Sequence, residues 1–215
     1  MRKKPKFGVF NDFWNGYPNH LPFLNLDDVP NPPEEWNLTK SIDRLDDIIS
    51  ENANAAIVAG IRLLLNNENW RPHLVAALAT LKIDKNLQTE IKTDLWNRLK
   101  SGSWVSPQIL VILSIIDAEF KLKAKEIVEK GFTITYSEMK KHEHHSARGP
   151  AGIGVDTNKV IASTKYLLNG VVTDAKENDN GGSLAKNWKE NLLRLIANNT
   201  FKIKNEDESN NHKTS

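Results

Sequence analysis

Cysteine is absent from this sequence of 215 residues. Its absence excludes disulfide bonds, catalysis by a thiolate and zinc sites with cysteine ligands. A chain without cysteine also fits a reducing compartment, and we expect a cytoplasmic protein.

Long hydrophobic runs are absent as well. The longest mostly apolar segment, AAIVAGIRLLL, contains Arg62 and is far shorter than the roughly 20 residues that span a bilayer. The first residues are basic, but Asn11, Asp12 and Asn15 interrupt the apolar residues that follow, so we expect no signal peptide. A membrane partner is therefore not expected.

Neither sign of charge is in large excess. The 29 basic and 27 acidic residues leave a net charge of +2, which is too small to indicate a nucleic-acid partner by itself. Seven basic residues do lie between residues 121 and 148, where four glutamates offset them. Binding of nucleic acid therefore stays open as an alternative.

Proline and aromatic residues are concentrated at the start of the chain. Residues 1–37 hold six of the nine prolines and seven of the sixteen aromatic residues. Proline at this density disfavours helix and central strand, and disordered segments are poor in aromatic residues. We therefore expect residues 1–38 to form an irregular arm, with Phe13, Trp14 and Tyr17 as candidate binding residues. The arm either packs on its own domain, burying Phe10, Phe13 and Trp14, or docks on a partner.

The sequence predicts a helical domain over residues 39–200, with a repeat-like part over 40–130 and C-terminal helices over 157–200. Residues 40–66 have the apolar spacing of a helical hairpin, with Thr39 or Ser41 as the N-cap and a break near Asn52.

Two later segments align as copies of one unit. Their prolines, Pro72 and Pro107, are 35 residues apart, and this alignment pairs Leu78 with Leu113 as equivalent buried residues. Each proline falls at the expected N1 position of a helix, and Ser106 is the expected N-cap of the second copy.

An amphipathic helix follows each copy, and in the second its apolar stripe contains Leu122, Ile127 and Val128. An apolar helix paired with an amphipathic one at this period predicts an all-α fold, a right-handed array of helical hairpins. In architecture it resembles the α-solenoids of the HEAT and armadillo class. An irregular helical bundle is the alternative.

The C-terminal third is predicted in less detail. FTITY, residues 132–136, alternates like a short strand but could also begin a helix. We expect one helix to begin near Asn158 with Asp156 or Thr157 as its cap, and the last helix to begin near Leu184 with Ser183 as its cap. Residues 201–215 are expected to form a polar, disordered tail.

Residues 140–159, KKHEHHSARGPAGIGVDTNK, are the segment richest in chemically active side chains. The histidines do not have the HExxH spacing of zinc enzymes, because position 146 is serine, and the glycines match no phosphate-binding motif. We expect residues 140–154 to form an exposed loop or a frayed helix end, without metal or cofactor, that contributes at most to a contact surface. The candidate binding residues of the whole segment are His142, His144, His145, Arg148 and Lys159.

Nothing in the sequence requires catalysis: GxSxG is absent, and so is a serine with an adjacent base. Trp104 and Asp117 could serve a helical-repeat DNA glycosylase, but Trp104 begins a repeat unit and is better explained by packing. We therefore expect a non-catalytic helical-repeat protein that binds another protein as an adaptor, scaffold or inhibitor. The alternatives are a nucleic-acid-binding repeat protein and a metal-dependent enzyme that uses residues 142–145.

Overall fold

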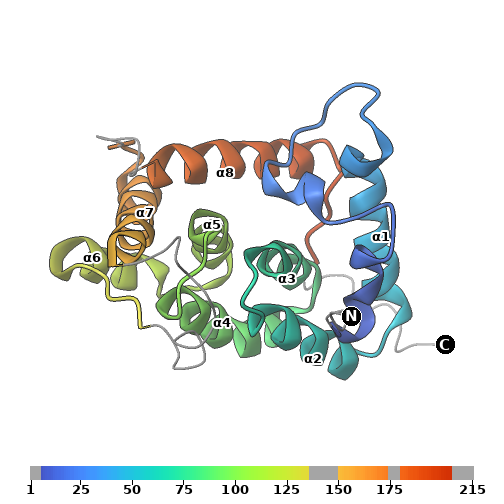
Figure 1. Cartoon of the computed structure of the whole chain (residues 1–215), viewed down its shortest axis with the longest axis horizontal. Helices are drawn as coiled ribbons and strands as arrows, with labels where there is room; N and C mark the ends of the chain where they lie inside the picture. Colours follow the sequence, from blue (N-terminus) through green and yellow to red (C-terminus); the bar gives the residue numbers. More distant parts are fainter. Residues whose placement is uncertain (1–5, 136–149, 174–179, 205–215) are drawn as a thin grey trace, which may run out of the picture. The chain divides into compact units, whose positions relative to one another are not determined.

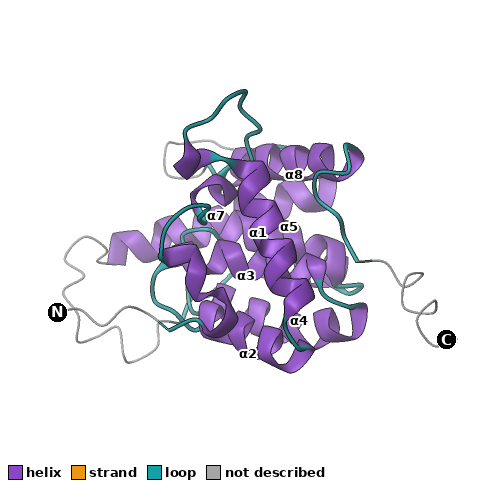
Figure 2. Ribbon diagram, turned by 90° about the vertical axis from the view of Figure 1, so that its right-hand side faces the viewer, coloured by secondary structure: helices purple, strands orange, loops and turns teal. Residues whose placement is uncertain are grey.

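The computed structural model describes residues 6–135, 150–173 and 180–204, with the side chains of residues 150–156 excepted. Its regular elements are all helical, and the described residues include no strand (Figure 2). The prediction of an all-α fold is therefore confirmed. None of the described helices is both long enough and apolar enough to cross a membrane.

The chain divides into two compact units. Unit 1 contains residues up to Lys92 together with those from Asn191 onward, and unit 2 contains Thr93–Glu190. Their boundaries fall inside two helices, α4 (Lys85–Lys100) and α8 (Gly181–Ala197), which are labelled in Figure 1.

The two helices predicted within residues 40–66 are present in unit 1 as α1 (Leu38–Glu51) and α2 (Asn54–Leu65). The N-cap of α1 is Asn37, whose side-chain oxygen accepts a hydrogen bond from the backbone N–H of Lys40 at 3.0 Å. The expected caps, Thr39 and Ser41, therefore lie inside the first turn. The helix begins earlier because an Asx side chain preceding it already satisfies a free backbone N–H.

The two apolar copies are helices α3 (Trp70–Lys82) in unit 1 and α5 (Ser106–Ile116) in unit 2. Leu78 and Leu113 are both fully buried, as predicted. The predicted helix starts are wrong by one or two positions: Pro72 is the third residue of its helix rather than the N1 residue, and Ser106 is the first residue rather than the N-cap. A proline is still tolerated there, because the N–H groups of the first turn have no partner within the helix.

Helix α6 (Phe120–Lys130) buries Ile127 of the predicted apolar stripe but not Leu122. Phe120, Ala124 and Ile127 are buried, whereas Leu122 is 72% exposed. A residue two positions after Phe120 is rotated by about 200° around the helix, so Leu122 points away from the buried face.

The C-terminal helix of unit 2 begins earlier than predicted. It is α7 (Pro150–Asn169), which packs on α5 and α6 (Figure 1). Asp156 and Thr157 therefore lie within the helix and do not cap it. Gly152 and Gly154 also lie within the helix. The glycine-rich segment therefore forms the first turns of the helix and is not a loop before it.

Helix α8 also begins before the predicted cap Ser183. Its first residue, Gly181, lies against α7 so closely that a Cβ there would be 2.2 Å from the carbonyl oxygen of Lys159. The Ser163 hydroxyl donates to one of two carbonyls at this point, that of Lys159 at 2.6 Å or that of Gly181 at 2.9 Å. Only a residue without a side chain fits this contact.

Residues 132–135 are neither strand nor helix, so both expectations for FTITY fail over these residues. The segment follows Gly131, whose φ of +85° favours glycine at the end of α6. The backbone N–H of Thr135 donates to the carbonyl of Lys100 at 2.7 Å. A single bond of this kind holds the segment beside α4 without forming a β ladder.

The expected tail boundary at residue 201 needs correction. Phe201 is fully buried in unit 1, and the N–H groups of Thr200 and Phe201 both donate to the carbonyl of Leu195. Burial of the apolar Phe201 ring stabilises the chain beyond the end of α8. Of the predicted tail, residues 205–215 lie outside the described residues.

The N-terminal arm packs on its own unit. It contains three short 3-10 helices, η1 (Gly8–Trp14), η2 (Leu21–Leu24) and η3 (Glu34–Trp36), of which η1 contacts α2 and η2 contacts α1 and α3. Phe10 and Phe13 are fully buried, as predicted for an arm that packs in cis, and Trp14 is half-buried.

Candidate protein-binding surface

Phe13 and Trp14 make contacts within the arm itself. The Phe13 ring is fully buried beside Phe23, with 5.6 Å between ring centres. The Trp14 ring stacks on His20 at 5.0 Å, and Nδ1 of His20 lies 3.2 Å from the carbonyl oxygen of Phe13. Burial holds the pKa of His20 below its ordinary value, so this ring stays neutral at physiological pH. Phe13 and Trp14 therefore stabilise the packing of the arm.

Tyr17 lies at the surface and is coupled to a second exposed aromatic residue. The Tyr17 side chain is 53% exposed and Trp36 is 42% exposed. The Tyr17 hydroxyl donates to Oε2 of Glu35 at 3.0 Å, and the Trp36 indole N–H donates to Oε1 of the same carboxylate at 3.2 Å. One carboxylate thus orients two aromatic side chains that are far apart in the sequence. We call these three residues the aromatic surface.

The segment that carries Glu35 and Trp36 is acidic. Residues 27–36, DDVPNPPEEW, contain four carboxylates and no basic residue. The hydrogen bond to Glu35, followed by the charge of that carboxylate, raises the pKa of Tyr17 above its ordinary value of 10.0. The phenol therefore remains a hydrogen-bond donor at physiological pH.

Contacts with the helices of unit 1 hold the arm in place. The Asn191 side-chain amide donates to the carbonyl of Asn25 and to Oδ1 of Asp27, each at 2.9 Å. Arg44 of α1 forms an ion pair of 2.6 Å with Asp12. An anchored segment loses less conformational entropy on binding than a free one does.

The remaining candidate residues do not join this surface. Lys159 is 7% exposed, and its ammonium nitrogen lies 4.9 Å from the centre of the Trp104 ring within unit 2. It therefore stabilises unit 2 through a cation–π contact and is not a surface cation. His142, His144, His145 and Arg148 lie outside the described residues.

Within the described part of the chain, no three His, Cys, Asp or Glu side chains are placed so that they could hold a metal ion. The cluster at residues 142–145 lies outside the described residues. The metal-enzyme alternative therefore receives no support from the described residues.

Sequence reasoning did not select Glu35 or Trp36 as candidates. Trp36 was one of seven aromatic residues in the arm, and sequence does not separate buried rings from exposed ones. The only local signal is the pair of glutamates that precedes it. The role of Glu35 becomes visible only through its hydrogen bond with Tyr17, which is 18 residues away in the sequence.

Comparison with known proteins identifies no relative. The chain matches no protein-family model, and no curated protein or solved structure is significantly similar to it. The functional proposal therefore depends on the chain's own residues.

Proposed function

We propose that this chain is a non-catalytic helical protein that binds another protein through the aromatic surface of Tyr17, Glu35 and Trp36. The observation that carries the proposal is the pair of exposed aromatic rings fixed by one carboxylate. Tyrosine and tryptophan are enriched among the residues that dominate protein–protein binding energy. They bury a large area at a low cost in side-chain entropy. Here that cost is lower still, because the hydrogen bonds to Glu35 already restrict both side chains before binding.

The charge around these rings favours a basic partner segment. Arginine and lysine stack on aromatic rings and pair with carboxylates, and arginine does both with one planar group. The segment that carries Glu35 also contains Asp28, together with Asp27, which accepts a hydrogen bond from Asn191, and Glu34, which forms an ion pair of 3.6 Å with Lys40. We therefore propose that the partner presents arginine or lysine side chains to this surface.

The proposed scaffold for this surface is an α-solenoid of helical hairpins. Its support is the order along the chain, in which each successive pair of helices, α1 and α2, α3 and α4, and α5 and α6, contains one apolar helix and one more polar helix. The complete burial of the equivalent residues Leu78 and Leu113 agrees with the 35-residue period. Helical arrays of this kind commonly act as adaptors, scaffolds or inhibitors, because they present extended surfaces to other proteins.

A capture experiment with matched variants tests the proposal. The full chain is immobilised and exposed to lysate, with and without nuclease, alongside the double variant Tyr17→Ala/Trp36→Ala. The control is Leu122→Ala, because Leu122 is also an exposed apolar residue but lies in unit 2. We expect a protein that survives nuclease treatment, binds wild type and control equally, and binds the double variant at least about tenfold more weakly.

Two results would contradict the proposal. Equal capture by the double variant would remove the aromatic surface from the binding site. Capture that disappears after nuclease treatment would favour the nucleic-acid alternative, since the retained partner would then be held through nucleic acid.

A further inference from the structure

Unit 2 contains a pocket of about 540 Å³ between α4, α6 and the segment that follows α6. Its apolar lining comes from Trp96, Ile127 and Phe132, and its basic lining comes from Lys100, Lys123 and Lys130, while Glu126 contributes one carboxylate. We call it the α4–α6 pocket. A volume of this size falls within the range of about 300–1,000 Å³ that is usual for sites of small organic ligands.

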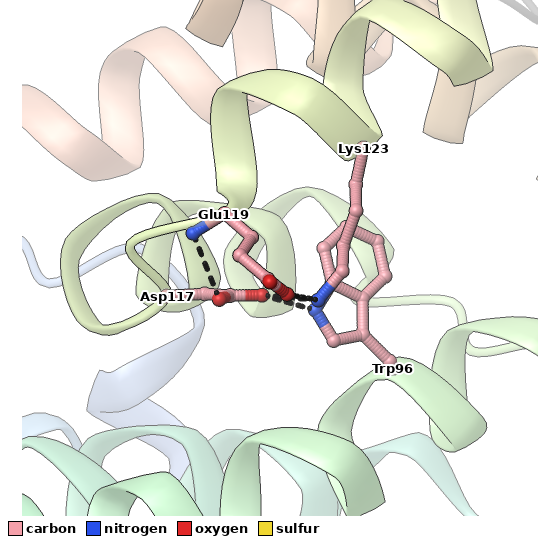
Figure 3. Close-up of polar contacts among 4 residues, drawn as sticks. All are labelled: Trp96, Asp117, Glu119 and Lys123. Atoms are coloured by element: carbon pink, nitrogen blue, oxygen red, sulfur yellow. Dashed lines mark hydrogen bonds and ion pairs between the residues drawn. The ribbon is translucent and has the colours of Figure 1, made fainter.

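The Trp96 side of the pocket is fixed by a buried carboxylate (Figure 3). The Trp96 indole N–H donates to Oδ2 of Asp117 at 2.8 Å, and the Asp117 side chain is fully buried. The Lys123 ammonium lies 2.9 Å from the same oxygen and 3.1 Å from Oε2 of Glu119. The backbone N–H of Glu119 completes the set by donating to Oδ1 of Asp117 at 3.1 Å.

This network keeps its charges over the physiological pH range. Burial alone would raise the pKa of Asp117, but hydrogen bonds from Lys123, Trp96 and the Glu119 N–H together hold it at about 2. Burial opposes the charge of Lys123 as well, yet its bonds to Asp117 and Glu119 raise its pKa above the ordinary value. The indole ring is therefore held in one orientation by groups that stay ionised.

The basic residues of the pocket differ in how far they are already neutralised. Lys123 is paired with Asp117 and Glu119, and Lys130 is paired with Glu126 at 2.9 Å. Among the described residues, no carboxylate pairs with Lys100. Its side chain is exposed, so it is the cation of this pocket that remains available to an incoming anion.

We propose that the α4–α6 pocket binds a small organic anion: an aromatic or aliphatic body against Trp96, Ile127 and Phe132, with an acidic head group at Lys100. The apolar residues and the unpaired cation line the same pocket, and this combination selects amphipathic acids over both neutral apolar molecules and small inorganic anions. The site lies wholly in unit 2 and does not depend on the proposed protein-binding surface of unit 1.

The test uses phenylbutyrate as the probe and phenylbutanol as its uncharged counterpart. Both are titrated into the full chain, and the Trp96 indole N–H signal is followed by nitrogen–proton correlation NMR after assignment with Trp96→Phe. We expect a saturable shift with phenylbutyrate and at least about tenfold weaker binding of phenylbutanol. Lys100→Gln should weaken phenylbutyrate binding about tenfold and leave phenylbutanol unchanged.

Lys121→Gln is the matched control, because Lys121 is an exposed lysine of α6 that does not line the pocket. It should leave both titrations unchanged. The proposal is overturned if phenylbutyrate causes no Trp96 shift up to about 10 mM, or if Lys100→Gln leaves its affinity intact. Binding of a glutamate-rich peptide at Trp96 in the absence of phenylbutyrate binding would also overturn it, and would assign the pocket to a protein partner.

Discussion

The ammonium group of Lys82 lies 4.0 Å from the centre of the Phe201 ring, so a lysine of α3 is covered by a residue 119 positions later in the chain. The same nitrogen lies 2.5 Å from Oδ1 of Asp46 in α1 and 3.5 Å from the carbonyl oxygen of Lys202. The Lys82 side chain is only 2% exposed. Within unit 1, one buried cation therefore joins two helices to the segment that follows α8.

Phe201→Ala should lower the free energy of unfolding by about 3–5 kcal/mol, because it removes a fully buried ring and exposes the buried Lys82. Urea unfolding measures this change. Lys202→Ala is the control: this neighbouring side chain is exposed, and its loss should change stability by less than about 0.5 kcal/mol. If both variants unfold like wild type, the segment after α8 does not pack as described.

Lys82→Met should make the stability of unit 1 depend differently on pH. Burial holds the pKa of Lys82 below its ordinary value of 10.5, although the hydrogen bond and charge of Asp46 offset part of this effect. Between the folded and the unfolded pKa the unfolded chain binds more protons, so the wild-type free energy of unfolding gains from this group as pH rises toward 10.5. Methionine fills a similar volume and abolishes that gain, while at neutral pH the two proteins should differ by less than about 2 kcal/mol.

The measurement compares urea unfolding of wild type and variant from neutral pH into the alkaline range. Lys40→Met serves as the control, because Lys40 is an exposed lysine whose ion pair with Glu34 spans 3.6 Å. Its loss should change the free energy of unfolding by less than about 0.5 kcal/mol at neutral pH. A difference for Lys82→Met that does not change with pH would show that Lys82 titrates as it does in the unfolded chain.

The sequence predicts the helical class and the positions of most helices, because their apolar periodicity is a local property. It predicts the burial of Leu78 and Leu113 for the same reason. Prediction from the sequence fails where the burial of a single residue depends on contacts with residues far away in the chain. Phe201 lies in a polar C-terminal stretch, and its burial involves a contact with Lys82, which is 119 positions earlier in the chain. The prediction for Leu122 is wrong in the opposite sense: this apolar residue was expected to be buried and is exposed. Its position on the helix relative to Phe120, and not its hydrophobicity, determines its exposure.

The candidate site was predictable in part. Aromatic density in the arm indicates residues such as Tyr17, but it does not separate this exposed ring from the buried ring of Phe13. That distinction depends on which ring reaches Glu35, a contact over 18 residues. Long-range contacts of this kind have no periodic signal in the sequence.

Asp117→Asn should lower the free energy of unfolding by about 1–2 kcal/mol at neutral pH, after allowance for the partial exposure of Lys123. Because the folded pKa of Asp117 is about 2 and its ordinary value is 3.8, its contribution is complete above the ordinary value and is lost as pH falls toward about 2. The difference between wild type and variant, measured by urea unfolding, should shrink over that window. Glu119→Gln, at an exposed carboxylate, should change stability by less than about 0.5 kcal/mol. A difference for Asp117→Asn that does not change with pH would contradict the network in Figure 3.

Gly60→Ala should destabilise the packing of the arm on α2. A Cβ at this position would lie 2.8 Å from a ring carbon of Phe10, which is fully buried. Overpacking of this kind should cost about 1–3 kcal/mol, against the gain of roughly 1 kcal/mol that alanine normally brings to a helix. Thermal unfolding checks the sign. In combination with Phe10→Leu the cost should be less than the sum of the two single changes, since the smaller side chain relieves the clash. A higher melting temperature for Gly60→Ala would show that the arm does not rest on this residue.

Glu35→Gln should lower the pKa of the Tyr17 phenol toward its ordinary value of 10.0. The hydrogen bond to Glu35 and the charge of that carboxylate are the two largest causes of its raised pKa, and glutamine keeps the shape of the side chain while removing the charge. Ultraviolet difference titration of wild type and variant measures the change, and Tyr17→Phe identifies which tyrosine step belongs to this residue. Glu34→Gln is the matched control: Glu34 raises the pKa of Tyr17 only through a weaker charge effect, so its loss should move the titration less. An unchanged titration in Glu35→Gln would show that Tyr17 and Glu35 are not in contact in solution, and would remove the observation on which the aromatic surface rests.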